Sequence, residues 1–80
     1  MQNKSENLFQ KGIESFRKKN FIEAEKCFEE LKSDHPTNKD ILKNLSLCYF
    51  QNKKFKNCEN VIKLMFDLGL KEKKLIEFLL

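Results

Sequence analysis

The sequence predicts an all-α protein that consists of two antiparallel helix-turn-helix hairpins followed by a fifth helix. Three observations support this fold class. Only 2 Gly and 1 Pro occur among the 80 residues, which favours helices joined by short turns. Apolar residues recur at three- and four-residue spacing in five segments, which is the period of an amphipathic helix. The chain also resembles itself after a shift that brings Leu8 onto Leu42.

Polar residues mark where two of these helices begin. Asn20 is suited to cap the second helix, and Glu23, three residues later, completes the pattern of a capping box. Thr37 or Asn38 is suited to cap the third helix. The five helices are therefore expected at about residues 5–18, 21–34, 39–52, 55–68 and 71–80.

Two of the helix ends are also marked in the sequence. His35 and Pro36 should end the second helix, because the residue before a proline avoids the helical region. Gly69 can adopt the left-handed conformation that commonly closes a helix, so the fourth helix should end just before it.

The self-similarity covers both hairpins. The same shift superimposes identical residues, namely Leu8 on Leu42, Phe16 on Phe50, Lys19 on Lys53, Phe21 on Phe55 and Glu25 on Glu59. Residues of similar size also coincide, including Gly12 with Ser46 and Phe28 with Ile62. This shift equals the period of the tetratricopeptide repeat, which is about 34 residues with two helices per unit. The alternative is a helical bundle whose self-similarity is accidental.

The residues of each unit resemble the tetratricopeptide repeat (TPR) family. The family signature has Leu-Gly and Tyr in the first helix, then Ala and Phe in the second, then Pro. The first unit supplies Gly12, Ala24, Phe28 and Pro36, and the second supplies Leu45, Tyr49 and a small Cys58. The departures are Lys11 in place of Leu, Ser15 in place of Tyr and Leu70 in place of Pro.

The resemblance implies one TPR domain over residues 1–80, with repeats at about 5–38 and 39–72 and a capping helix at about 71–80. Such repeats stack into a right-handed α-solenoid whose concave groove is lined by the first helix of each unit. The small residues Gly12 and Ser46 would allow the two helices of a hairpin to approach closely. The groove would present Phe9, Ile13, Phe16, Arg17, Lys43, Asn44, Leu47, Phe50, Gln51, Lys74 and Phe78.

A groove of this composition is expected to bind a peptide or helix of another protein, as an adaptor, a scaffold or a co-chaperone-like module. One subset of the family grips a carboxylate with a clamp of Lys, Asn and Arg. Only Asn44 and Lys74 match that clamp, while Phe9, Ile13 and Phe78 occupy its other positions and cannot replace the hydration of a carboxylate. The expected partner instead has an apolar anchor and an acidic or polar flank. In the alternative, these three apolar residues belong to the core.

The expected fifth helix carries apolar residues at adjacent positions between Leu75 and Leu80. They cannot all face the preceding hairpin, whereas terminal repeats normally present a polar outer face. A homodimer or a partner contact through this segment is one explanation, and it makes a homo-oligomerising scaffold the alternative function. Further repeats beyond Leu80 are the other explanation.

The composition argues against the remaining classes of function. The net charge of +4 is modest, and acidic residues are frequent in the second helix, so no nucleic-acid partner is expected. The single histidine, His35, lies beside a proline. No base is expected near Ser15, Ser33 or Ser46. No nucleotide-binding or hydrolase motif occurs in the sequence. We therefore expect no enzyme activity, no catalytic residue and no cofactor.

The cysteines and the hydropathy pattern indicate the compartment. Cys27, Cys48 and Cys58 lie in apolar helical patterns without a CxxC pair, which is typical of buried thiols in a reducing environment and predicts no metal site. No apolar run has the length of a signal peptide or reaches the ~20 residues of a membrane span. The expected location is the cytoplasm, with no membrane partner.

Overall fold

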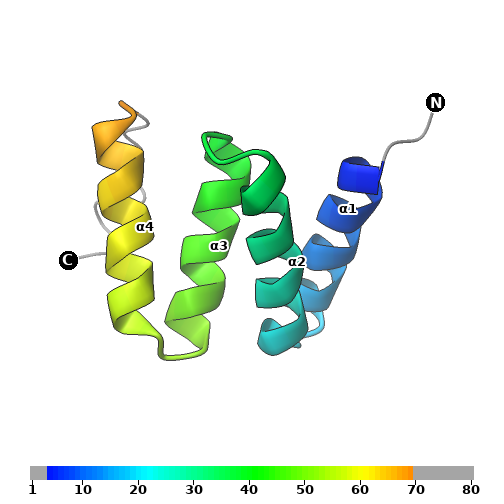
Figure 1. The fold of residues 1–80 in the computed structure, drawn as a ribbon. Helices are drawn as coiled ribbons and strands as arrows, with labels where there is room; N and C mark the ends of the chain where they lie inside the picture. Colours follow the sequence, from blue (N-terminus) through cyan, green and yellow to red (C-terminus); the bar gives the residue numbers. More distant parts are fainter. Residues whose placement is uncertain (1–3, 70–80) are drawn as a thin grey trace.

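The computed structural model describes residues 4–69, and these residues form four helices that lie side by side in a row (Figure 1). They are α1 (Lys4–Arg17), α2 (Phe21–Asp34), α3 (Lys39–Gln51) and α4 (Phe55–Asp67). Successive helices run in opposite directions, and α1 packs on α2, α2 on α3 and α3 on α4. The all-helical class and the two hairpins are thus confirmed for this part of the chain. The expected helix at 71–80 lies outside the described residues.

The repeat in the sequence is also present in the structure. Both α2 and α4 begin at a phenylalanine, Phe21 and Phe55, which the sequence shift superimposes. The same shift superimposes the last residues of α1 and α3, Arg17 and Gln51. The two hairpins are therefore repeats of one structural unit within the described residues.

The turns inside the two hairpins have the same geometry. Lys19 and Lys53 adopt positive φ angles of 64° and 63°. In the first turn the N–H of Lys19 donates to the carbonyl of Phe16 at 2.9 Å, and the N–H of Asn20 donates to the carbonyl of Ser15 at 2.8 Å. The same pair of hydrogen bonds recurs at the equivalent positions of the second turn, at 3.0 and 2.8 Å. This pattern is the Schellman motif, which satisfies carbonyls at a helix end.

A ring pair closes each of these turns. Phe16 meets Phe21 with ring centroids 5.0 Å apart, and Phe50 meets Phe55 at 5.5 Å, both edge to face. Because the rings join the last turn of one helix to the first turn of the next, they hold the helices of each hairpin together at the turn.

The helix caps agree in part with the expectation. The side chain of Asn38, and not that of Thr37, caps α3 by accepting from the N–H of Ile41 at 3.1 Å. The Asn20 side chain accepts from the N–H of Glu23 at a long 3.4 Å. The other half of the expected capping box is not formed, because Asn20 donates its N–H to the Schellman turn and Glu23 pairs with Lys11 at 3.5 Å. As expected, His35 caps the end of α2, and Gly69 follows α4 with a φ of 77°.

The core lies between the helices, and Gly12 allows α1 to pack closely on α2. A Cβ atom at Gly12 would lie 2.8 Å from Cζ of Phe28, whose ring is fully buried. A larger residue would therefore displace the Phe28 ring or force α1 away from α2. Within residues 4–69, the main core cluster contains 12 buried residues, listed here in chain order: Ala24, Phe28, Leu31, Ile41, Leu42, Leu45, Cys48, Tyr49, Cys58, Val61, Ile62 and Met65.

A buried polar network joins the two hairpins. The carboxylate of Glu25 accepts from the amide of Asn52 at 2.7 Å and from the ammonium of Lys54 at 2.6 Å, and its side chain is only 7% exposed. The hydrogen bond to Glu25 raises the pKa of Lys54, because it favours the charged form. Nearby, the hydroxyl of Tyr49 donates to Glu29 at 2.7 Å. This network fixes the end of α3 and the turn after it against α2.

The outer position of α1 accounts for two polar residues at positions where α3 has buried residues. Lys11 and Ser15 of α1 correspond to Leu45 and Tyr49 of α3, which are buried. The Lys11 side chain is 63% exposed, and α1 lies at one end of the row (Figure 1). A polar residue suits that position because no described helix lies beyond it.

Candidate functional site

The expected groove corresponds to one face of α1 and α3, and the structure describes most of its residues. Arg17, Phe50 and Gln51 are exposed. Six others are half-buried: Phe9, Ile13, Phe16, Lys43, Asn44 and Leu47. Lys74 and Phe78 lie outside the described residues. The face therefore combines apolar side chains that keep part of their surface exposed with polar side chains in the middle of α3 and at the ends of α1 and α3.

Some apolar side chains of this face also contact the core. The ring of Phe9 packs edge to face on Phe28, with centroids 5.5 Å apart. Ile13 and Phe16 pack against the same core cluster. Both roles considered for these residues, core and groove, are thus compatible with their placement. On α3, the apolar members of this face are Leu47 and Phe50, and neither belongs to the core cluster.

Asn44, the central polar residue of the expected groove, bonds to its own helix. Its side-chain amide donates to the backbone carbonyl of Asp40 at 2.8 Å, one turn earlier. One of the two N–H donors of this amide is therefore used within the helix, and the other remains.

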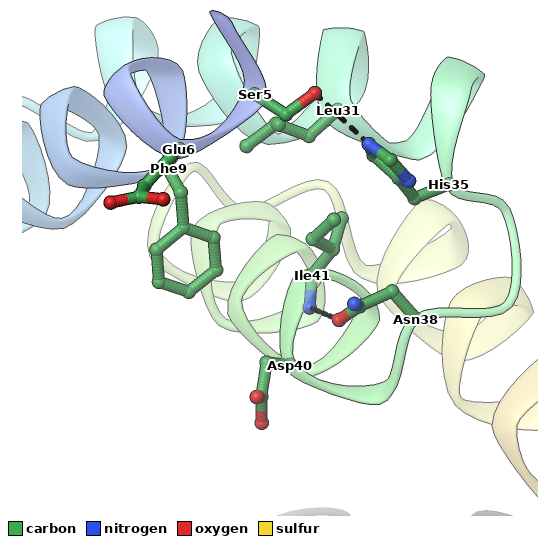
Figure 2. A pocket seen from close by; sticks show the side chains of 8 residues that line it. All are labelled: Ser5, Glu6, Phe9, Leu31, His35, Asn38, Asp40 and Ile41. Carbon is green, nitrogen blue, oxygen red and sulfur yellow. Dashed lines mark hydrogen bonds between the residues drawn. The ribbon is translucent and has the colours of Figure 1, made fainter. Parts of the chain in front are cut away.

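A pocket opens where the first turns of α1 and α3 approach the end of α2 (Figure 2). Its volume is about 320 Å³. The ring of Phe9 reaches from α1 towards the start of α3, so the pocket continues the face described above. The lining residues come from all three helices and the loop between α2 and α3: Ser5, Glu6, Phe9, Leu31, His35, Asn38, Asp40 and Ile41.

Ser5 and His35 meet at one side of this pocket. The Ser5 Oγ and the His35 Nε2 are 3.0 Å apart, and the contact joins the start of α1 to the end of α2. A serine beside an imidazole can act as a nucleophile when a third group orients the ring. Within residues 4–69 no carboxylate hydrogen-bonds the other nitrogen of His35, and both side chains lie near the surface. The geometry supports a structural link better than catalysis.

The charged side chains that line the pocket are Glu6 and Asp40, and no Lys or Arg is among the lining residues. Both carboxylates lie in the first turn of a helix, where negative charge complements the helix dipole. Lys4 and Lys39 begin the same two helices, so charges of both signs lie near the pocket. The basic residue Arg17 lies at the opposite end of α1.

Sequence reasoning identified only Phe9 among the residues of this pocket. Ser5 and His35 are 30 positions apart, and their contact depends on how α1 packs on α2. Glu6 and Asp40 do carry a signal, because acidic residues in a first turn are visible in the sequence. Their convergence on one pocket depends on the repeat, which places the first turns of α1 and α3 beside each other.

The three cysteines are free thiols in the interior. Burial raises the pKa of all three, and that of Cys48 rises to about 12. A buried thiol with a raised pKa is a weak nucleophile and a weak metal ligand. Among residues 4–69 no group of three or more His, Cys, Asp or Glu side chains could hold a metal ion.

Comparison with known proteins does not extend these observations. No family model, curated protein or solved structure matches this chain. Within the described residues, no helix is long and apolar enough to cross a membrane. A functional assignment therefore depends on the geometry of the chain itself.

Proposed function

We propose that this chain is a TPR-type repeat protein that binds a segment of another protein on the face formed by α1 and α3. The observation that carries the proposal is the half-buried apolar surface of Phe9, Ile13 and Leu47, which leads into the pocket between the two first turns. The repetition of the hairpin unit and the close contact at Gly12 support the TPR assignment.

The chemistry of the face suggests the chemistry of the partner. An apolar side chain would pack on Phe9 at the pocket. A hydrogen-bond donor would suit the carboxylate of Asp40, and an acidic group would suit Arg17 at the other end of α1. An amphipathic helix or an extended segment with these groups in order would match the face. The buried free thiols favour a reducing compartment such as the cytoplasm.

Selection from a displayed library of random peptides would test the proposal without knowledge of the natural partner. A selected peptide would then be titrated into isotope-labelled protein, with chemical-shift changes followed by NMR. We expect the changes to concentrate at Phe9, Ile13 and Leu47. Changes confined to α2 and α4 would contradict the proposed site.

A pair of variants provides a second test. Leu47→Ser with Gln51→Glu alters the proposed face, and Lys26→Gln with Glu30→Gln alters exposed positions on α2. Circular dichroism establishes that both variants fold. The first variant should weaken peptide binding at least tenfold, while the second should bind as the wild type does. Equal loss in both variants would refute the proposed face.

The alternative function, a self-associating scaffold, depends on the segment between Leu75 and Leu80, which lies outside the described residues. Sedimentation over a range of concentrations distinguishes the two. A mass that rises with concentration, together with the absence of any selected peptide, would favour the scaffold.

A further inference from the structure

Lysine occupies a left-handed conformation at the same place in both hairpin turns. The φ angles of Lys19 and Lys53 are 64° and 63°, in a region that side chains other than glycine rarely adopt. Glycine is the usual residue at this position of a Schellman motif. The chain therefore carries local strain twice, at equivalent positions, and such strain is often retained for function.

The two turns are also strongly basic. Residues 16–22 and 50–56 together contain six basic residues and no acidic residue. Lys54 pairs with Glu25, and Lys56 pairs with Glu59 at 3.4 Å. The other four basic residues are exposed and form no ion pair within residues 4–69: Arg17, Lys18, Lys19 and Lys53.

Both turns lie along one edge of the molecule, at the bottom of Figure 1. The loop between α2 and α3 lies at the opposite edge. We call the two segments, residues 16–22 and 50–56, the basic edge. Two large apolar side chains in it are well exposed, Ile22 at 67% and Phe55 at 56%. The edge thus combines cations with apolar side chains.

We propose that the basic edge binds the surface of a membrane that contains anionic lipids. Clusters of four to eight basic residues beside exposed apolar side chains are typical of surfaces that bind anionic headgroups. The two turns project from the ends of the helices, so both can touch a flat surface at once. The membrane would be bound peripherally, through headgroup contacts of the lysines and shallow insertion of Ile22 and Phe55.

Nucleic acid is less well matched to this edge. Single strands are bound by aromatic rings whose faces are open to stack on bases. The ring of Phe55 is instead held edge to face by Phe50 at 5.5 Å. The hollow beside Ile22 and Lys54 is also lined by the carboxylates of Glu25 and Glu29, which would repel an acidic peptide. The basic edge shares Arg17 and Gln51 with the end of the α1–α3 face. Its proposed membrane contact depends on Lys19, Lys53, Ile22 and Phe55, which are not part of that face, and so does not depend on the function proposed for it.

Cosedimentation with lipid vesicles tests this site. The full chain would be mixed with vesicles of phosphatidylcholine alone or of phosphatidylcholine with phosphatidylserine. We expect binding only to the second kind, weakening as the salt concentration rises. Failure of the wild type to sediment with the anionic vesicles would overturn the proposal. Tighter binding to single-stranded RNA or to polyglutamate than to these vesicles would also overturn it.

A matched pair of double variants locates the binding. In Lys19→Gly with Lys53→Gly, glycine relieves the strained turns, so the protein should fold at least as stably as the wild type. Its affinity for anionic vesicles should fall about fivefold for each lysine removed. The control, Lys4→Gln with Lys63→Gln, removes the same charge from exposed positions of α1 and α4 away from the turns. An equal loss in the control would mean that net charge, and not the basic edge, causes binding.

Discussion

The polar network between the hairpins makes a sharp prediction about stability. Glu25 and Glu59 are equivalent residues of the two repeats, but their side chains are 7% and 50% exposed. Replacing Glu25 with alanine should destabilise the fold, while the same change at Glu59 should have little effect. Because both sites are early in a helix, helix propensity changes equally and cancels in the comparison.

The size of the effect follows from the contacts. Removal of the Glu25 carboxylate leaves the Asn52 amide with only the carbonyl of Phe21, at 3.1 Å, as an acceptor. A hydrogen bond to a charged group contributes about 1.5–3 kcal/mol. The Lys54 side chain is half exposed, so its ammonium would recover hydration and adds little to the loss. We expect Glu25→Ala to lower the free energy of unfolding by about 2 kcal/mol. For a domain of this size, that loss lowers Tm by about 10 °C.

Urea unfolding followed by circular dichroism at the helical band measures both free energies. Glu59→Ala should lose less than about 0.5 kcal/mol, as most exposed substitutions do. If the two alanine variants lose the same amount, the buried network does not hold the hairpins together, and the inference from its short distances is wrong.

Three further predictions concern the core, a turn and a thiol. Gly12→Ala should lower the free energy of unfolding by about 1–2 kcal/mol, because the clash with Phe28 outweighs the gain in helix propensity. Adding Phe28→Leu to the same chain should recover part of that loss, as measured by urea unfolding. Lys19→Gly alone should raise the free energy of unfolding by about 0.5–1 kcal/mol, and a decrease would show that the left-handed conformation is not strained. Cys48 should lower the stability of the fold in alkali. Below its ordinary pKa of 9.0, the thiol is protonated in both the folded and the unfolded state. Above that pH the unfolded chain ionises first, so the free energy of unfolding falls as pH rises towards about 12. The fall between pH 8 and pH 10.5 should be shallower in Cys48→Ala, and equal slopes would contradict the burial of this thiol.

The helices could be predicted from the sequence because their signals are local. Apolar spacing and the break at His35 and Pro36 define α2 without knowledge of the fold. The pocket could not be predicted in the same way, because Ser5 and His35 meet only when α1 packs on α2.

The polar interactions between the hairpins could not be predicted from the sequence either. A glutamate on a helix is normally exposed, so nothing local distinguishes Glu25 from Glu59. The difference arises because α3 and the turn after it cover Glu25. The sequence match between the two positions reveals the repeat, but it does not reveal which copy is covered.

The close contact at Gly12 has a consequence for the pocket beside Phe9, whose ring packs on the same Phe28. Because the main contacts join successive helices, the orientation of α1 relative to α3 is transmitted through α2. A change in the spacing between α1 and α2 would therefore alter the width of the pocket beside Phe9, although Gly12 does not line it. The size of a residue outside the pocket can therefore set the shape of the pocket.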